Sequence, residues 1–327
     1  MKAEIRRMMG GCWLVAGLLG LSPGLAQAQS YPSRPLAMII PNAPSGSTDL
    51  VGRTVGDKLA GELGQPVVID NQPGAMGAIG LQSLVRAKPD GYTLGLGTIG
   101  TIAINPVVNP KLTWDPLADF APISMIGSTP FALIANASLP VETVADLIEL
   151  AKTKPGQLTY ATGGVGGSQH VGMEMLLQMG GIEMLHVPYK GSGPALIDLI
   201  GGHVDVMIEP AVSAAAHVKE GTVKILALTG SETSPEFPDV PLVSDTLAGY
   251  DISAWFALFA PAGTDAESVK LLSEKTGLVL EMPDVVQILT RAGFHISSST
   301  PEELGDFLKN EVDKWEKVVK AAGIKAE

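Results

Sequence analysis

The stretch PNAPSGSTD, residues 41–49, lies between an apolar run at 36–40 and a segment with helical character that begins near Leu50. It holds two prolines, one glycine, three hydroxyl side chains and one aspartate, but no lysine or arginine. Such a stretch is either an ordinary turn that ends in an N-cap or a binding loop whose donors are backbone amides. In a binding loop, Gly46 supplies positive φ or close approach. The helix cap is then Ser47, Thr48 or Asp49.

Short β-rich runs alternate with helical patterns on both sides of residue 125. LAMII, VVID and YTLGL precede the first break, and FALIA, LTYA, MLHV, VDVMI and KILAL follow it. This alternation predicts strands and crossover helices in two mostly parallel α/β units. Three further helical patterns come after YDISAWFALFAP, and the last begins at Pro301 and stops at Gly323. We expect these helices to pack on the first unit, so that the chain crosses between lobes near 125–131 and 252–259.

The N-terminus has the pattern of a secretory signal peptide. Basic residues precede an apolar run, and Ala26 and Ala28 fit a small-x-small cleavage site. We therefore expect residues 1–28 to be removed and the mature chain to work in the periplasm. Cys12, the one cysteine, lies inside this segment, so the mature chain has no thiol for a disulfide or a zinc site.

Composition excludes several classes of protein. The signal carries a net charge of +2 and the whole chain −12, so the mature chain has a formal charge of −14. Nucleic acid is not an expected partner, because a duplex surface requires a basic stripe. Outside the signal, no stretch has the roughly 18 unbroken apolar residues of a spanning helix.

A second strand-to-helix loop, ATGGVGGSQH at 161–170, also lacks lysine and arginine and holds four glycines. In open α/β sheets, ligands lie at such loops outside the carboxyl ends of the strands. Two uncapped helix N-termini form an anion site without any basic side chain. Two further loops, DNQPGAMG at 70–77 and PYKGSGP at 188–194, are candidates to join them, and Lys190 is either a partner for a ligand carboxylate or solvated.

No enzyme or metal-site motif in this sequence has the context that its chemistry requires. GLGTIG, at 95–100, matches a dinucleotide-binding pattern, but Pro106 leaves little room for the helix that would receive a pyrophosphate. The pattern G-x-S-x-G occurs inside the expected signal peptide. His170 and Glu174 are spaced for a metal, but no third ligand is near. We expect no catalytic residues, no metal and no cofactor.

Taken together, the loops resemble those of the substrate-binding receptors of tripartite tricarboxylate transporters, the Bug-type family. The matching motifs span the mature chain and include PNAPSGSTD, GQPVVIDNQPGAMGAIG, KPDGYTLGLGT, GGSQH, HVPYKGSGPALIDLIGGHVDVM, WFALFAPAGT and KWEKVVKAAGI. The resemblance implies a two-lobed periplasmic-binding-protein fold (type II, Venus flytrap). The expected lobes are 29–127 with 257–327, and 128–256.

The resemblance also implies a ligand and a set of binding residues. The family captures an organic acid, such as a di- or tricarboxylate, between its first loop and the glycine-rich loop of the second lobe. Position by position, this gives Ala43, Ser45, Gly46, Ser47, Asp49, Gly163, Gly164, Ser168 and His170. The candidate set further includes Asn42, Met76, Thr98, Thr101, Tyr189 and Glu209.

This chain departs from the family pattern at five positions. Asn42 stands where an aromatic residue is usual, Ser45 and Met76 where glycine is common, and Glu209-Pro210 replaces a more typical Asp-Asn pair. Glu209 either faces the pocket, where it disfavours a distal carboxylate, or faces solvent or caps a helix. Ligand identity therefore cannot be carried over from a relative.

The expected function is that of a monomeric receptor without catalytic activity. It is expected to deliver a carboxylate to the large and small membrane subunits of a tripartite transporter. Two alternatives stay open at this point: a receptor that presents its ligand to a sensor protein, and a secreted α/β enzyme that acts on a small acid.

Overall fold

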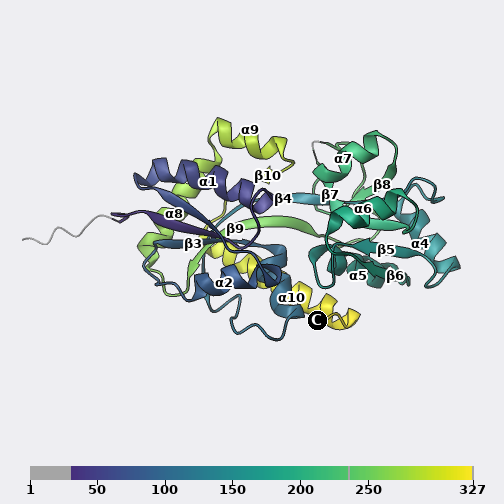
Figure 1. The fold of residues 1–327 in the computed structure, drawn as a ribbon, viewed down its shortest axis with the longest axis horizontal. Helices are drawn as coiled ribbons and strands as arrows, with labels where there is room; N and C mark the ends of the chain where they lie inside the picture. Colours follow the sequence, from purple (N-terminus) through teal and green to yellow (C-terminus); the bar gives the residue numbers. More distant parts are fainter. Residues whose placement is uncertain (1–30, 235, 326–327) are drawn as a thin grey trace, which may run out of the picture. The chain divides into compact units, whose positions relative to one another are not determined.

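The computed structural model describes residues 31–325 except residue 235. The expected signal peptide, its cleavage site and Cys12 lie outside the described residues. Figure 1 shows helices on both sides of a mixed sheet, whose strand order is β2-β1-β3-β9-β4-β7-β5-β6. Within the described residues, no helix has both the length and the apolar composition needed to span a bilayer.

Parallel strands form the first part of the sheet. β1 (Leu36–Ile40) pairs in parallel with β2 (Val67–Asn71) and β3 (Thr93–Thr98). α1 (Ser47–Leu63) connects β1 to β2, and α2 (Ala78–Val85) connects β2 to β3. The predicted alternation of strands and helices is confirmed here, and each loop after a strand leads into a helix N-terminus.

A second set of parallel strands forms the other end of the sheet. β5 (Thr159–Thr162) pairs in parallel with β6 (Leu185–Pro188) and β7 (Val206–Pro210). The helices of this part are α4 (Val144–Thr153), α5 (Ser168–Gly180), α6 (Ser192–Ile200) and α7 (Ala211–Lys219). The carboxyl ends of β5 and β6 lead into α5 and α6, which places the glycine-rich loop and the PYKGSGP loop side by side.

One long strand, β4 (Phe120–Asn136), belongs to both parts of the sheet. It pairs antiparallel with β9 (Ser253–Pro261) through Pro130, and with β7 and β8 (Val223–Leu228) from Phe131 onward. β8 and β9 follow one another along β4, because Leu228 lies opposite Ala132 and Ser253 opposite Pro130. The predicted crossings are therefore paired strands and not free linkers.

The C-terminal helices are α8 (Ala266–Leu280), α9 (Pro283–Arg291) and α10 (Pro301–Ala322), and β10 (His295–Ile296) pairs with β4. Thr300 caps α10 in a capping box with Glu303, and Gly323 ends it with φ 65°, so the predicted start and stop are confirmed. α8 and α9 pack against α1, as expected. α10 differs from expectation, because it also packs against α5, where Gln178 Nε2 donates to the carbonyl of Val318 at 3.1 Å.

The buried apolar side chains form three clusters. One cluster lies under α1, α8 and α9, and a second lies under α6 and α7. The third runs continuously under α2, α10, α5 and α4, from Leu81 through Trp315 to Leu176. The two parts of the sheet therefore share a core on one face and have separate cores on the other.

The remaining short elements are η1 (Ala75–Gly77), η2 (Ile99–Ile104), α3 (Asn105–Val108) and η3 (Val243–Asp245).

Candidate functional site

The loop after β1 has its left-handed residue one position earlier than the sequence suggested. Gly46 has φ −88° and is the N-cap of α1, whereas Ser45 has φ 71°. A Cβ added at Gly46 would meet only the carbonyl oxygen of Ala43, at 3.8 Å. Of the two alternatives for Gly46, positive φ is therefore wrong, and close approach of a ligand to this glycine stays a prediction.

Asp49 holds this loop in place. Its Oδ2 accepts hydrogen bonds from the backbone N of Ser45 and from Nε of Arg53, both at 2.9 Å, and its Oδ1 accepts from Nδ2 of Asn71 at 2.9 Å. The hydrogen bond from Arg53 contributes most to lowering the pKa of Asp49 to about 2. Because the carboxylate is buried and engaged three times, it is an anchor for the Ser45 conformation.

The N-terminus of α1 lacks a side-chain cap. The N-cap is Gly46, with no side-chain hydrogen bond, so the expectation that Ser47, Thr48 or Asp49 fills the N-cap position is wrong. The first amides of a helix have no partner within the helix. Those of Ser47 and Thr48 are therefore available to an anion outside the helix.

The segment before α2 is a run of left-handed residues. Gly74, Ala75, Met76 and Gly77 have φ values of 129°, 48°, 54° and 86°. The fully buried Asn105 holds the turn, since its Nδ2 donates to the carbonyls of Ala75 at 3.1 Å and Met76 at 3.2 Å. At the two non-glycine residues, Ala75 and Met76, such conformations cost of order 1–3 kcal/mol each, and they cluster at functional sites.

The residues with a strained backbone lie in the same loops as the sequence motifs. Within residues 31–325 other than 235, the non-glycine residues with positive φ are Ser45, Ala75 and Met76. Two side-chain oxygens in this region, Oδ1 of Asn42 and Oδ1 of Asn105, are buried and have no hydrogen-bond partner in the part of the chain that the structure describes. Both observations point to this region as one that accommodates a ligand or water.

In the glycine-rich loop after β5, side chains of α5 hold the backbone. Gly163 N donates to Oε1 of Gln169 at 3.1 Å, and Gly166 N donates to Nδ1 of His170 at 2.9 Å. His170 is buried and stacks on His186 with ring centroids 4.0 Å apart. Burial, and then His186, lowers the pKa of His170 to about 4, so the ring is neutral at pH 7 and supports the loop.

A cavity of about 230 Å³ brings the glycine-rich loop, the PYKGSGP loop and the left-handed turn together. It is lined by Met76, Gly163, Gly164, Val165, Gly167, Ser168, Gln169, Gly191 and Ser192. The N-caps of α5 and α6 are Gly167 and Gly191, and neither helix has a side-chain cap. The first turns of two helices therefore meet at one cavity, and no described lysine or arginine lines it. This arrangement is suited to an anion.

Four of the predicted ligand-binding residues line this cavity: Met76, Gly163, Gly164 and Ser168. The others do not line it and remain predictions. Thr98 and Thr101 form a reciprocal cap on η2, in which Thr98 N donates to Oγ1 of Thr101 at 2.9 Å. The hydroxyl of Tyr189 donates to Oδ2 of Asp198 at 2.6 Å, and Lys190 is exposed.

Glu209 is buried beside this cavity, with 5% of its surface exposed. Its Oε2 accepts a hydrogen bond from Nε2 of Gln169 at 2.9 Å. Burial raises its pKa to about 7, and hydrogen bonds from Ser192 and Gln169 partly oppose that rise. The alternative in which Glu209 faces solvent or caps a helix is wrong, because its side chain is buried and α7 begins after Pro210 without a side-chain cap. Glu209 does not line the cavity itself, so its contact with a ligand stays a prediction.

Five further residues line the cavity but were not in the predicted set of binding residues: Val165, Gly167, Gln169, Gly191 and Ser192. All five lie inside the two loops that the sequence analysis quoted, ATGGVGGSQH and PYKGSGP. The role of Gln169 was not visible in the sequence, because it depends on contacts with two other segments. Its Nε2 donates to Oγ of Ser192 at 3.1 Å as well as to Glu209, which connects three loops through one amide.

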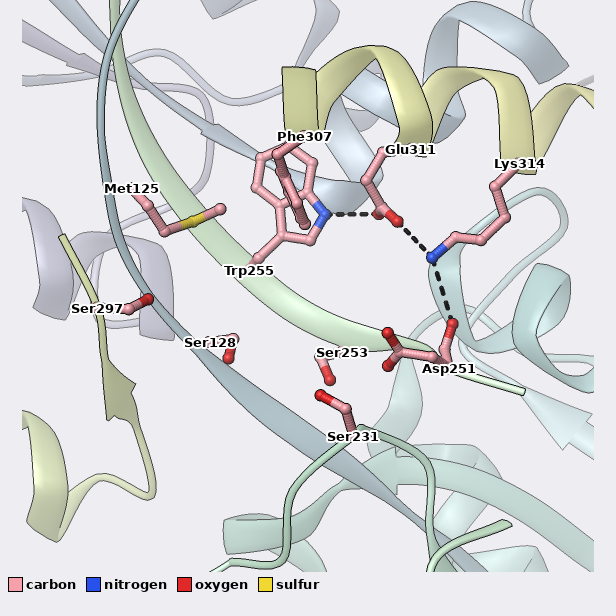
Figure 2. Close-up of a pocket in the computed structure, with 10 residues that line it drawn as sticks. All are labelled: Met125, Ser128, Ser231, Asp251, Ser253, Trp255, Ser297, Phe307, Glu311 and Lys314. Carbon is pink, nitrogen blue, oxygen red and sulfur yellow. Dashed lines mark hydrogen bonds and ion pairs between the residues drawn. The ribbon is translucent and has the colours of Figure 1, made fainter. Parts of the chain in front are cut away.

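A second cavity, of about 270 Å³, lies against β4, β9 and α10 and contains none of the predicted residues (Figure 2). Two of its charged groups, Glu311 and Lys314, pair with each other. Glu311 Oε2 accepts from Nε1 of Trp255 at 2.7 Å and from Nε1 of Trp315 at 3.0 Å, and its Oε1 pairs with Lys314. Nζ of Lys314 also donates to the carbonyl of Asp251 at 3.3 Å.

The fold and the cavity together define a class of protein, the two-lobed periplasmic solute-binding receptors. Solved structures support that assignment. The chain is 33% identical to the R. palustris protein Rpa4515, solved with adipate, with a TM-score of 0.77 and coverage of 90% of this chain and 99% of that one. It is 32% identical to MatC of Rhodopseudomonas palustris, solved with bound malate, with a TM-score of 0.74 and coverage of 88% and 100%.

The family follows from the sequence comparison. Residues 51–324 match the family described as "Tripartite tricarboxylate transporter family receptor". The chain is also 35% identical to Protein BugT of Bordetella pertussis over 318 residues, which cover 95% of this chain and 97% of that protein. The chain belongs to the tripartite tricarboxylate transporter receptor family, as its motifs predicted.

Proposed function

We propose that this protein is an extracytoplasmic receptor that binds a small carboxylate and delivers it to the membrane subunits of a tripartite tricarboxylate-type transporter. The observation that carries the proposal is the cavity at the uncapped N-termini of α5 and α6, where amides converge without a basic side chain. The relatives solved with adipate and malate support a carboxylate as the ligand. The protein acts without catalysis, as a monomer, after removal of residues 1–28 in the periplasm.

The available interactions are strong enough for a transport receptor. Each helix N-terminus contributes up to about 2 kcal/mol to a partly buried anion, and each charge-assisted hydrogen bond about 1.5 to 3 kcal/mol. A few such bonds reach the roughly 8 kcal/mol of micromolar affinity.

When the receptor captures a ligand, the first lobe adds its own contacts to those made by α5 and α6. The lobes are residues 29–127 with 257–327, and residues 128–256, and they turn about β4 and β9. Closure brings the free amides of α1, with Asn42, Ala43, Ser45, Gly46 and Ser47, onto a ligand held at α5 and α6. Solution scattering measures this closure as a smaller radius of gyration with saturating ligand, and an unchanged radius contradicts it.

A thermal-shift screen of mono-, di- and tricarboxylates tests the ligand class. A ligand at about 100 times its Kd stabilises the folded state by roughly 2.7 kcal/mol, which is a readily measured shift. Neutral analogues in which every carboxylate is an amide are the matched controls. If no acid in the screen shifts the transition, the proposed function is wrong.

The substitution Ser168→Asp tests the place of binding. Ser168 lies in the first turn of α5, where a negative charge stabilises the helix but occupies the anion site. We expect the affinity for the best acid to fall by about a hundredfold, or about 2.7 kcal/mol, with no loss of folding stability. Ala266→Asp places the same charge in the first turn of α8 and is the control. Equal affinities of both variants for the acid would place the site elsewhere.

A further inference from the structure

One apolar residue reaches the candidate anion site from another part of the sheet. The described residues that line the cavity belong to the loops after β5 and β6 and the helices they open, except Met76, which lies in the turn before α2. The backbone of Met76 is left-handed, with φ 54° and ψ 38°, a conformation that glycine adopts at much lower cost. Because Met76 is also 37% exposed, it adds little to the core, and the reason for a side chain at this position lies in the cavity that it lines.

The short helix α3 holds Met76 beside the glycine-rich loop. Asn105, at the start of α3, donates to the carbonyls of Ala75 and Met76. Val108, at the end of α3, lies against the loop, because a Cβ added at Gly166 would be 3.3 Å from Cγ2 of this valine. One helix therefore positions both the methionine and the loop, so Met76 is a fixed part of the cavity wall.

Two of the polar side chains in the cavity are bonded to each other. Oε1 of Gln169 accepts from N of Gly163 at 3.1 Å, and Nε2 of Gln169 donates to Oγ of Ser192 at 3.1 Å. The same Nε2 donates to Glu209 at 2.9 Å. Both hydrogens of the Gln169 amide are therefore in use, and this amide donates to a ligand only if one of these bonds breaks.

The third polar side chain lies where the carboxylate is expected. Ser168 is the first residue of α5, beside the amides that are free to bind an anion. The other lining residues with a side chain are Met76 and Val165, since the remaining four are glycines. The part of a ligand beyond its carboxylate therefore meets an apolar surface.

Such a surface distinguishes between ligands by what their carbon chain carries. A hydrocarbon chain gains from burial against it, and the flexible thioether of methionine adapts to chains of different shape. A hydroxyl group on the same chain gives up its hydrogen bonds to water and gains none from these two side chains, which lowers the affinity.

We propose that Met76 is a specificity-determining residue that makes the receptor prefer a carboxylate with an unsubstituted hydrocarbon chain over one that carries hydroxyl groups on that chain. The inference rests on the proposed function, because it takes the carboxylate to be held at α5 and α6. Glycine is common at this position in the family pattern that the motifs imply, and glycine has no side chain with which to cover the ligand. The preference therefore belongs to this chain.

The test compares probes that differ by one hydroxyl group. For each acid that binds in the thermal-shift screen, calorimetry at pH 7 gives the ratio of the dissociation constants of its hydroxylated and unsubstituted forms, such as 3-hydroxybutyrate and butyrate or malate and succinate. Both members of a pair carry the same charge at this pH, so the ratio reports the surroundings of the carbon chain. We expect the wild-type mature protein to bind the unsubstituted member about tenfold more tightly.

Two variants at the same position separate the side chain from the backbone. Met76→Gln keeps the length of the side chain and the cost of the left-handed backbone but can bond to a hydroxyl group, so the ratio should fall below about threefold. Met76→Gly removes the side chain and relieves the backbone. It should be at least as stable as the wild type in urea unfolding and should also lose the preference, and it gives the same comparison if Met76→Gln does not fold.

Met179→Gln is the matched control. Met179 lies in the last turn of α5, is 37% exposed like Met76, and does not line the cavity. This variant should keep the wild-type affinities and the wild-type ratio.

The outcomes are distinct. A wild type that binds the hydroxylated members as tightly as the unsubstituted ones overturns this inference and leaves the proposed function standing. The same holds for a ratio that neither variant of Met76 changes, or that Met179→Gln lowers as much as Met76→Gln does. Failure of every carboxylate to bind in the screen overturns the proposed function, and this inference with it.

Discussion

Two buried glutamates, Glu209 and Glu311, show how differently this protein treats the same side chain. Each has 5% of its surface exposed. Glu311 is paired with Lys314 and accepts hydrogen bonds from two tryptophans, so its charge is balanced where it lies. Among the described residues, the partners given for Glu209 are the neutral side chains of Gln169 and Ser192. The charge of Glu311 is compensated within the core by Lys314. The carboxylate of Glu209 lies beside a cavity without such a cation, so a group of a ligand can compensate its charge.

The largest expected effect comes from removing the cation that pairs with Glu311. Lys314→Met leaves Glu311 buried without its cation, and removing one partner of a buried pair typically costs 3–5 kcal/mol. Because the Lys314 side chain is 27% exposed, we expect the lower end, about 3 kcal/mol, in urea unfolding at pH 7. The double variant with Glu311→Gln is the control and should recover most of the loss. A single variant as stable as the wild type would show that the two tryptophans alone support the charge.

A smaller effect is expected at Glu209, and its sign depends on pH. Burial raises the pKa of this carboxyl in the folded state from 4.5 to about 7, so the proton is held more tightly in the folded chain. The stabilisation is complete below pH 4.5 and is lost as the pH rises through 7. Glu209→Gln should therefore be more stable than the wild type at pH 8, by about 2 kcal/mol, and not at pH 4.5. Urea unfolding at the two pH values measures this difference, and parallel curves for the two proteins would contradict it.

The smallest effect is expected at Gly46. Its φ of −88° suits any residue and a Cβ there has space, so Gly46→Ala should change the free energy of unfolding by about 0.5 kcal/mol or less. Gly52→Ala, in the same helix, is the contrast, because its Cβ would lie 2.2 Å from Cδ1 of Ile40. If Gly46→Ala nevertheless weakens ligand binding tenfold, the ligand approaches the α1 amides closely. An unchanged affinity returns PNAPSGSTD to the status of an ordinary turn.

The sequence predicted what depends on local pattern. The alternation of strands and helices, the two arginine-free loops and the ends of α10 follow from periodicity, glycine placement and capping residues, all of which act within a few positions. The positive φ was assigned to Gly46 for the same local reason, since glycine is the usual left-handed residue. In the folded chain, Asp49 and Asn71 hold Ser45 in that conformation instead, and only the tertiary structure brings Asn71 to that loop.

What remained hidden depends on contacts between distant segments. Gln169 reaches Ser192 and Glu209, which are 23 and 40 positions away, and Asn105 reaches back 30 positions to Ala75. Trp255 meets Glu311 across 56 positions. Amide and indole groups in such roles carry no spacing pattern, so neither the arrangement of the cavity nor the balance of Glu311 was predictable from the sequence.

The length of β4 has a consequence for how the chain acquires its structure. Because one strand of 17 residues supplies hydrogen bonds to both parts of the sheet, neither lobe has a complete set of strands without the other. A fragment cut between the lobes would leave half of β4 as an exposed edge, which is prone to pair with other chains. We expect a single cooperative unfolding transition for the mature protein, and recombinant lobes that aggregate when expressed separately but assemble when expressed together.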